Sequence, residues 1–147
     1  MLHPAPTSKI ALHLARGTVA EHIAATATKP AFVVLSIPNT SYKLHLEPTS
    51  PIDTPVGKRI VGTIQAQAQR VDVVTTGGRF IDPLFGRPRR VQGVVVRADA
   101  GSNTLIVHAG VPVICSLTDA RQNAADFKQG DFVSFDVLRG ATFTPER

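Results

Sequence analysis

The sequence predicts a mainly β protein made of short antiparallel strands. Its apolar runs are rich in Val and Thr, which favour strands, and 11 Gly and 11 Pro residues divide these runs with turns. No helical pattern between the central strands is long enough for the crossover of a parallel βαβ unit. With 147 residues, 43% of them apolar, the chain is expected to bury a core as one domain without a disulfide or a metal.

The domain is expected to have an N-terminal extension. Residues 1–8 show no apolar periodicity, which predicts a flexible tail. A single β-rich domain is then expected over 9–147, with the extension at 9–48 and a barrel at 58–143.

One or two short helices are predicted. Thr18 precedes Glu21 by three residues, the spacing of a helix capping box, so a helix is expected over 19–27. A second short helix is expected over 119–127, capped by Thr118 or Asp119.

The clearest β-hairpin lies in the extension. Its strands are expected over 32–37 and 42–47, joined by the turn residues Pro-Asn-Thr-Ser. Apolar and polar residues alternate in the second strand, and its solvent-exposed face is expected to contain Lys43, His45 and Glu47.

The barrel is expected to follow a proline-broken connector at 49–57. Apolar and polar residues alternate over 59–68, and the phase flips in the next strand, 71–76, so a turn or bulge is expected near Gln69 and Arg70. Later strands are predicted over 91–97, 103–109, 111–117 and 131–138.

From Arg90 the expected order is strand, turn, strand, glycine turn, strand, short helix, glycine turn and strand. This order resembles the middle of an OB-fold barrel, and FKQGDFVSFDV at 127–137 resembles a late strand of cold-shock-like domains. The resemblance covers residues 90–138 and implies an antiparallel OB-like barrel that binds oligonucleotides or oligosaccharides on one face. Gly62 and Gly93 suit the coiled strands of such a barrel. The aromatic RNA-binding signatures of cold-shock domains are absent, and the chain has no Trp.

Positive charge is concentrated in the middle of the chain. Residues 58–97 hold eight Lys or Arg against two acids, a balance of +6 that exceeds the formal net charge of +5 of the whole chain. Within them, the basic loop, defined here as residues 79–90, is broken by Pro and Gly and is expected to project its side chains. A concentrated positive field attracts nucleic acid, another polyanion or an acidic protein surface.

The predicted contact surface is built mainly from arginines of the basic loop, which suit bidentate recognition of phosphate or carboxylate. Phe80 and Phe85 are expected to supply apolar or stacking area. A rival interpretation pairs Arg89 and Arg90 with Asp82 or with acids of the C-terminal block. The full polyanion-binding set is Arg79, Arg87, Arg89, Arg90, Arg97, Lys58 and Arg59.

Three classes of function stay open at this point. The basic block indicates a non-catalytic polyanion-binding module, and strands that are apolar on both faces indicate a protein-interaction or assembly subunit, including a homo-oligomer. The salt dependence of binding separates these two classes. An enzyme is not expected, since no catalytic motif is found, and neither is a cofactor.

Other reactive groups have structural interpretations. The five His are too scattered for a zinc site, and Cys115 shares a face with valines, which predicts a buried, inert thiol. Gly77-Gly78-Arg79 is expected to form a hairpin turn, because it lacks the Lys-Ser/Thr of a nucleotide loop. Cap, turn or solvated roles are expected for Asp119, Asp126, Asp131 and Asp136.

The compartment is inferred from two absences. The chain has a single Cys, so no intramolecular disulfide is expected. It also lacks an apolar segment of about 20 residues. A cytoplasmic protein without a membrane partner is therefore expected.

Overall fold

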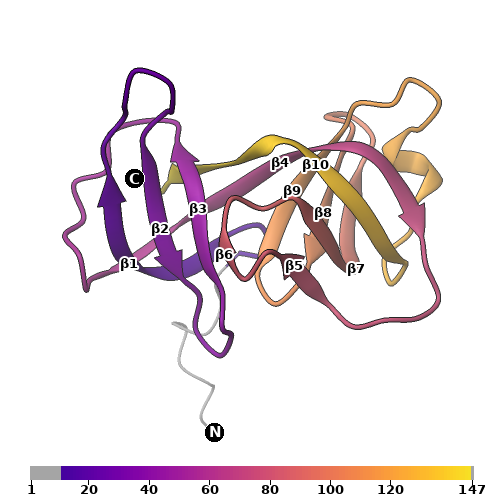
Figure 1. Cartoon of the computed structure of the whole chain (residues 1–147). Helices are drawn as coiled ribbons and strands as arrows, with labels where there is room; N and C mark the ends of the chain where they lie inside the picture. The colour runs from indigo at the N-terminus through magenta and orange to yellow at the C-terminus, as the bar shows by residue number, and fades with distance from the viewer. Residues whose placement is uncertain (1–10, 147) are drawn as a thin grey trace, which may run out of the picture.

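The computed structural model describes residues 11–146 and is mainly β, with 55% strand and 2% helix. Two long strands cross the whole molecule, and shorter strands gather at either end of them (Figure 1). The elements are β1 (Ala15–Ile23), β2 (Phe32–Ser36), β3 (Lys43–Pro48), β4 (Arg59–Val73), β5 (Phe80–Asp82), β6 (Phe85–Gly86), β7 (Arg90–Asp99), β8 (Thr104–His108), β9 (Pro112–Leu117), the 3-10 helix η2 (Ala124–Asp126) and β10 (Phe132–Pro145).

Backbone pairing closes the strands into two adjoining rings that share β4 and β10. The N-terminal ring runs from β1 through β2, β3, β10 and β4 back to β1. The C-terminal ring runs from β4 through β9, β8, β7 and β10 back to β4. Neighbours in the rings are antiparallel, except for the parallel pairs β3 with β10 and β4 with β9. The expected N-terminal extension therefore pairs its strands with both long strands.

The strand β4 carries the predicted irregularity. Val71 pairs with Phe135 of β10, and the next pair is Ala68 with Val137, so three steps on β4 oppose two steps on β10. The extra residue on β4 lies at Gln69 or Arg70, so the bulge predicted from the flip in apolar phase is confirmed.

The strand β10 has a larger bulge where it passes from one ring to the other. Leu138 pairs with Gln67, and the next pair is Thr142 with Gln65, so four steps on β10 oppose two steps on β4. Within the bulge Arg139 and Gly140 have positive φ angles of 60° and 73°. The regular pairing of the two long strands is interrupted at this point.

The core lies inside the two rings. Fully buried side chains include Leu44 and Phe143 in the N-terminal ring and Leu105 and Phe135 in the C-terminal ring. Burial of each such side chain stabilises the fold by roughly 1.5–3 kcal/mol. The alternation of apolar and polar residues along the strands thus directs one face of each strand inward.

Gly93 permits a close approach of two backbones in the C-terminal ring. A Cβ atom at this position would lie 2.7 Å from the carbonyl carbon of His108 and 3.0 Å from the Cα atom of Ala109. No side chain fits there, so packing requires this glycine.

The expected helix over 19–27 is wrong, because its first half belongs to β1. Thr18 and Val19 are β-branched, and β1 pairs with both β2 and β4. These two ladders outweigh the local capping-box pattern, which carries no information about distant strands.

The second expected helix, over 119–127, is reduced to η2. This single turn is capped by Asn123, whose side chain accepts a hydrogen bond from the amide of Ala125. The flexible tail expected over 1–8 lies outside the described residues. Between residues 11 and 146, no helix has the length and apolar character needed to span a membrane.

Candidate functional site

The basic loop is attached to both rings. Its strand β5 pairs with β7 of the C-terminal ring, and its strand β6 pairs with β3 of the N-terminal ring (Figure 1). The amide of Lys43 donates to the carbonyl of Leu84 at 2.7 Å, and the amide of Arg89 donates to the carbonyl of Asp82 at 2.8 Å. The loop is therefore a closed turn whose backbone is held at its base and near its tip.

Tyr42 ties the loop to the core. Its hydroxyl donates to the carbonyl of Ala109 at 2.9 Å and accepts from the amide of Ile81 at 3.0 Å. Burial raises the pKa of Tyr42, and the hydrogen bond from Ile81 partly opposes this shift. One buried hydroxyl thus joins the hairpin of the N-terminal ring, a turn of the C-terminal ring and β5.

Arg87 and Arg90 make contacts within the protein. The Nη2 atom of Arg87 donates to the carbonyl of Arg139 at 2.7 Å, and its guanidinium lies 5.1 Å from the ring centroid of Phe32. Arg90 forms an ion pair with Asp136 at 2.7 Å. The rival interpretation, pairing with an acid of the C-terminal block, therefore describes Arg90, while Arg87 holds the bulge of β10.

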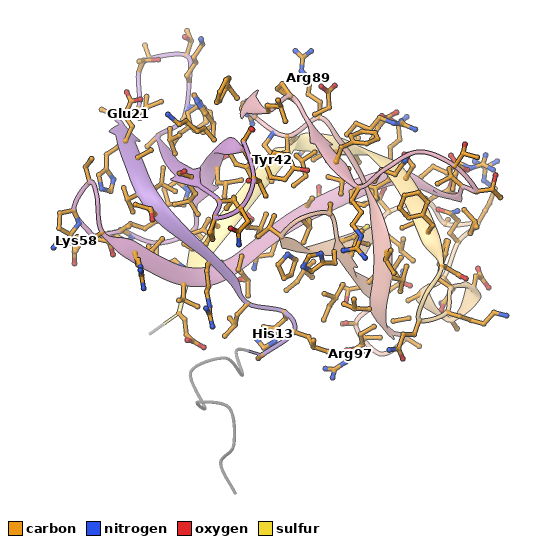
Figure 2. The ribbon with its side chains drawn as sticks, turned by 90° about the horizontal axis from the view of Figure 1, so that it is seen from below. His13, Glu21, Tyr42, Lys58, Arg89 and Arg97 are labelled. Carbon is orange, nitrogen blue, oxygen red and sulfur yellow. The ribbon has the colours of Figure 1, made fainter. Side chains whose placement is uncertain are left out.

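Arg79 and Arg89 are both exposed, whereas Phe80 is not. Arg79 is exposed, and its Nη1 atom lies 3.4 Å from Nδ1 of His108. Burial lowers the pKa of His108, and the positive charge of Arg79 lowers it further. Phe80 is half-buried, whereas Arg89 is exposed and projects from one edge of the ribbon in Figure 2.

Phe85 and Leu84 form an exposed apolar pair near the tip of the loop. Phe85 is 63% exposed and Leu84 is 48% exposed. The Nζ atom of Lys43 lies 6.0 Å from the centroid of the Phe85 ring, the outer limit of a cation–π contact. We name Lys43, Leu84, Phe85 and Arg89 the loop face.

Lys43 is a residue that the sequence did not assign to the site. The alternation in the hairpin predicted that it faces water. However, the parallel pairing of β6 with β3 brings it beside Phe85, and a pair of residues so far apart in the chain leaves no local signal.

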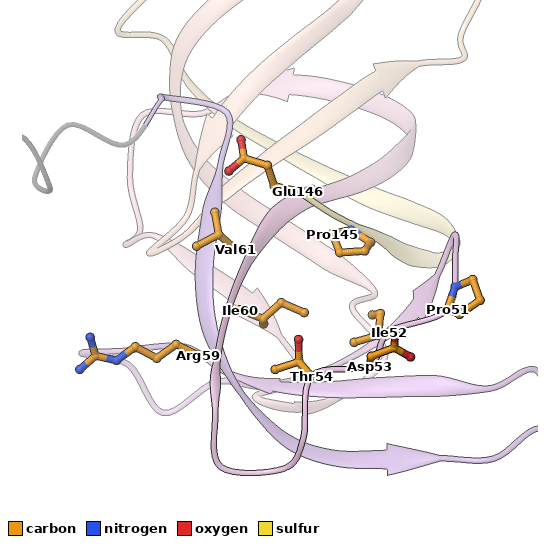
Figure 3. A pocket seen from close by; sticks show the side chains of 9 residues that line it. All are labelled: Pro51, Ile52, Asp53, Thr54, Arg59, Ile60, Val61, Pro145 and Glu146. Atoms are coloured by element: carbon orange, nitrogen blue, oxygen red, sulfur yellow. The ribbon is translucent and has the colours of Figure 1, made fainter.

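The remaining predicted cations lie elsewhere. In Figure 2 Lys58 marks the end of the N-terminal ring, and Arg97 lies at the edge of the ribbon opposite Arg89. Arg59 borders a pocket of about 300 Å³ between the 51–54 segment and the end of β10, but its side chain extends away from the other lining residues (Figure 3). The structure therefore does not bring the predicted set together on one surface.

Cys115 and three of the aspartates have the structural roles expected of them. Burial raises the pKa of Cys115 to about 12, so its thiol is inert at neutral pH. The hairpin turn expected at Gly77-Gly78-Arg79 is wrong, because this segment connects β4 to β5 and these two strands do not pair with each other. The carbonyl of Gly78 accepts a hydrogen bond from the side chain of Gln92. Asp119, Asp126 and Asp131 accept hydrogen bonds in local turns or caps. Among residues 11–146, no three His, Cys, Asp or Glu side chains gather as a metal site would require.

Comparison of the chain with models of protein families, with curated proteins and with solved structures finds no match.

Proposed function

We propose that this protein is a non-catalytic binding module of the OB type that binds single-stranded nucleic acid through the loop face. The observation that carries the proposal is Phe85, an aromatic ring left 63% exposed on a strand whose backbone is held by the N-terminal ring. Stacking of a base on an exposed aromatic ring contributes about 1–3 kcal/mol and tolerates any sequence. Lys43 beside the ring and the exposed Arg89, four positions further along the basic loop, supply positive charge for phosphate groups.

Two further properties support this proposal. Each ring of pairings contains five strands, the number in an OB-type barrel. The sequence pI of about 10.0 favours an anionic partner. A cytoplasmic location, proposed from the single Cys, is compatible with such a partner.

Fluorescence anisotropy with a labelled single strand of about 12 nucleotides tests the proposal, because OB folds cover about 4–16 nucleotides. We expect Phe85→Ala to weaken binding about tenfold or more, and Arg89→Gln to weaken binding and to reduce the salt slope by about 1. Matched controls are Val73→Ala, an exposed apolar residue on β4, and Arg97→Gln, an exposed cation on the opposite edge. Equal losses in the variants and their controls would show that the loop face is not the contact surface.

A second candidate function is supported by the apolar character of Leu84 and Phe85. An assembly subunit would bury this pair against protein, and its association would respond little to salt. Light scattering separates the two functions. A stable homo-oligomer that Phe85→Ala dissociates, in a protein without nucleic-acid affinity, would favour assembly.

A further inference from the structure

A groove lies at the junction of the two rings. Its volume is about 470 Å³, within the range of small-ligand sites. It lies at the bulge of β10, between the pairs that Leu138 and Thr142 form with β4. The groove is lined by Glu47, Thr49, Gln65, Ala66, Gln67, Ser116, Leu138, Arg139, Gly140 and Thr142.

One polar side chain of this groove, that of Gln65, is held in place by hydrogen bonds. The side-chain oxygen of Gln65 accepts hydrogen bonds from the hydroxyls of Thr142 at 3.0 Å and Thr144 at 3.1 Å. Because this oxygen already accepts two hydrogen bonds, Gln65 can interact with a ligand through the N–H donors of its side-chain amide. Gln67 is exposed and is paired in register with Ser116 of β9. The groove therefore presents hydrogen-bond donors from β4, and the side chain of Gln65 among them is held by Thr142 and Thr144.

Glu47 adds a carboxylate acceptor to these donors. It lies on β3, where the alternate residues Leu44 and Leu46 point into the core. The outward side chains of this strand therefore include both Lys43 and Glu47, which stand four residues apart. Four residues of a strand span about 13 Å.

The groove and the loop face are thus the two ends of one path along β3. Lys43 lies beside Phe85 at one end, and Glu47 lines the groove at the other. Arg87 connects the same regions through its hydrogen bond to the carbonyl of Arg139, which also lines the groove. A strand of about 4–16 nucleotides, the site size of an OB fold, is long enough to reach from Phe85 to the groove.

We infer that the groove accepts one unstacked base of the strand bound at the loop face and prefers cytosine to uracil. This inference rests on the proposed function. Cytosine presents an exocyclic amine donor beside ring and carbonyl acceptors. Its amine matches the carboxylate of Glu47, and its acceptors match the side-chain amides of Gln65 and Gln67. Uracil presents a carbonyl in place of the amine, so it would place an acceptor against the carboxylate.

The test compares oligodeoxycytidine with oligodeoxyuridine of equal length, because the two pyrimidines offer nearly the same ring for stacking on Phe85. We expect the wild-type protein to bind oligodeoxycytidine at least about fivefold more tightly. Glu47→Gln and Gln67→Ala should each reduce this ratio, whereas Phe85→Ala should weaken both probes and leave the ratio. Gln69→Ala is the matched control, because Gln69 is exposed on the same strand and does not line the groove.

The outcomes separate this inference from the proposed function. If both probes bind through the loop face with equal affinity, the inference about the groove is wrong and the proposed function stands. If neither probe binds, the proposed function fails. If Glu47→Gln strengthens both probes equally, the carboxylate only repels phosphate and the inference is overturned. A mononucleotide, deoxycytidine monophosphate, that binds as tightly as the oligonucleotide would also overturn it, since the groove would then act without the strand.

Discussion

Replacing Tyr42 by Phe removes a single oxygen atom and retains the aromatic ring. The lost hydroxyl makes two hydrogen bonds, to the carbonyl of Ala109 and from the amide of Ile81, and the side chain is buried. Each bond contributes about 0.5–1.5 kcal/mol net, so the free energy of unfolding should fall by about 1–3 kcal/mol. For a chain of this size each kcal/mol lowers the melting temperature by about 2–4 °C, which gives a decrease of about 2–12 °C.

Thermal and urea unfolding followed by circular dichroism measure this change. Hydrogen exchange should also show faster exchange of the Ile81 amide, because its acceptor is lost. The control is Ser102→Ala, which removes an exposed hydroxyl that contacts Thr104; a change within about 0.5 kcal/mol is expected there. If Tyr42→Phe unfolds like the wild-type protein, Tyr42 does not secure the basic loop to the core.

Three further predictions concern separate parts of the C-terminal ring. Gly93→Ala should destabilise the protein by about 1–3 kcal/mol or more in urea unfolding, whereas Gly78→Ala, where a Cβ atom meets nothing within 4 Å, should not. The pKa of His108 is lowered in the folded state, so the unfolded chain takes up the proton first as the pH falls. The contribution of the neutral imidazole to the free energy of unfolding should therefore be complete above about pH 6.5 and be lost as the pH falls through the folded pKa. In His108→Gln the free energy of unfolding should depend less on pH. Cys115 should resist a thiol reagent at mildly alkaline pH until denaturant is added, and rapid labelling of the native protein would contradict its burial.

The elements that could be predicted from the sequence are those with a local signal. The hairpin of β2 and β3 has alternation and turn residues side by side, and the bulge near Gln69 follows from a flip in apolar phase. The strand β1 could not be recognised, because it depends on pairing with β2 and β4, and the Thr18 and Glu21 spacing favoured a helix locally. The continuation of β10 to Pro145 likewise depends on pairing with distant strands.

The residues of the candidate site also divide into those that the sequence predicted and those whose position depends on distant pairing. The exposure of Phe85 was expected, because Pro and Gly around it prevent a helix or a central strand. The sequence left open whether Arg90 contacts a ligand or pairs with an acid of the C-terminal block. The register of β7 against β10 places Arg90 opposite Asp136, and the two side chains form an ion pair. The position of Lys43 beside Phe85 could not be predicted, since it depends on two short parallel strands from different parts of the chain.

The sharing of β4 and β10 has a consequence for how the chain folds. Thr49 and Thr144, whose hydroxyls lie 2.7 Å apart, are separated by 95 positions, and they lie near the parallel pair that closes the N-terminal ring. Neither ring can close before the last strand has been placed, so a fragment that contains β1 to β3 alone has no complete core to stabilise it. Such dominance by distant contacts is typical of domains that fold in milliseconds to seconds. We therefore expect the two rings to unfold together in one cooperative transition, without a stable half.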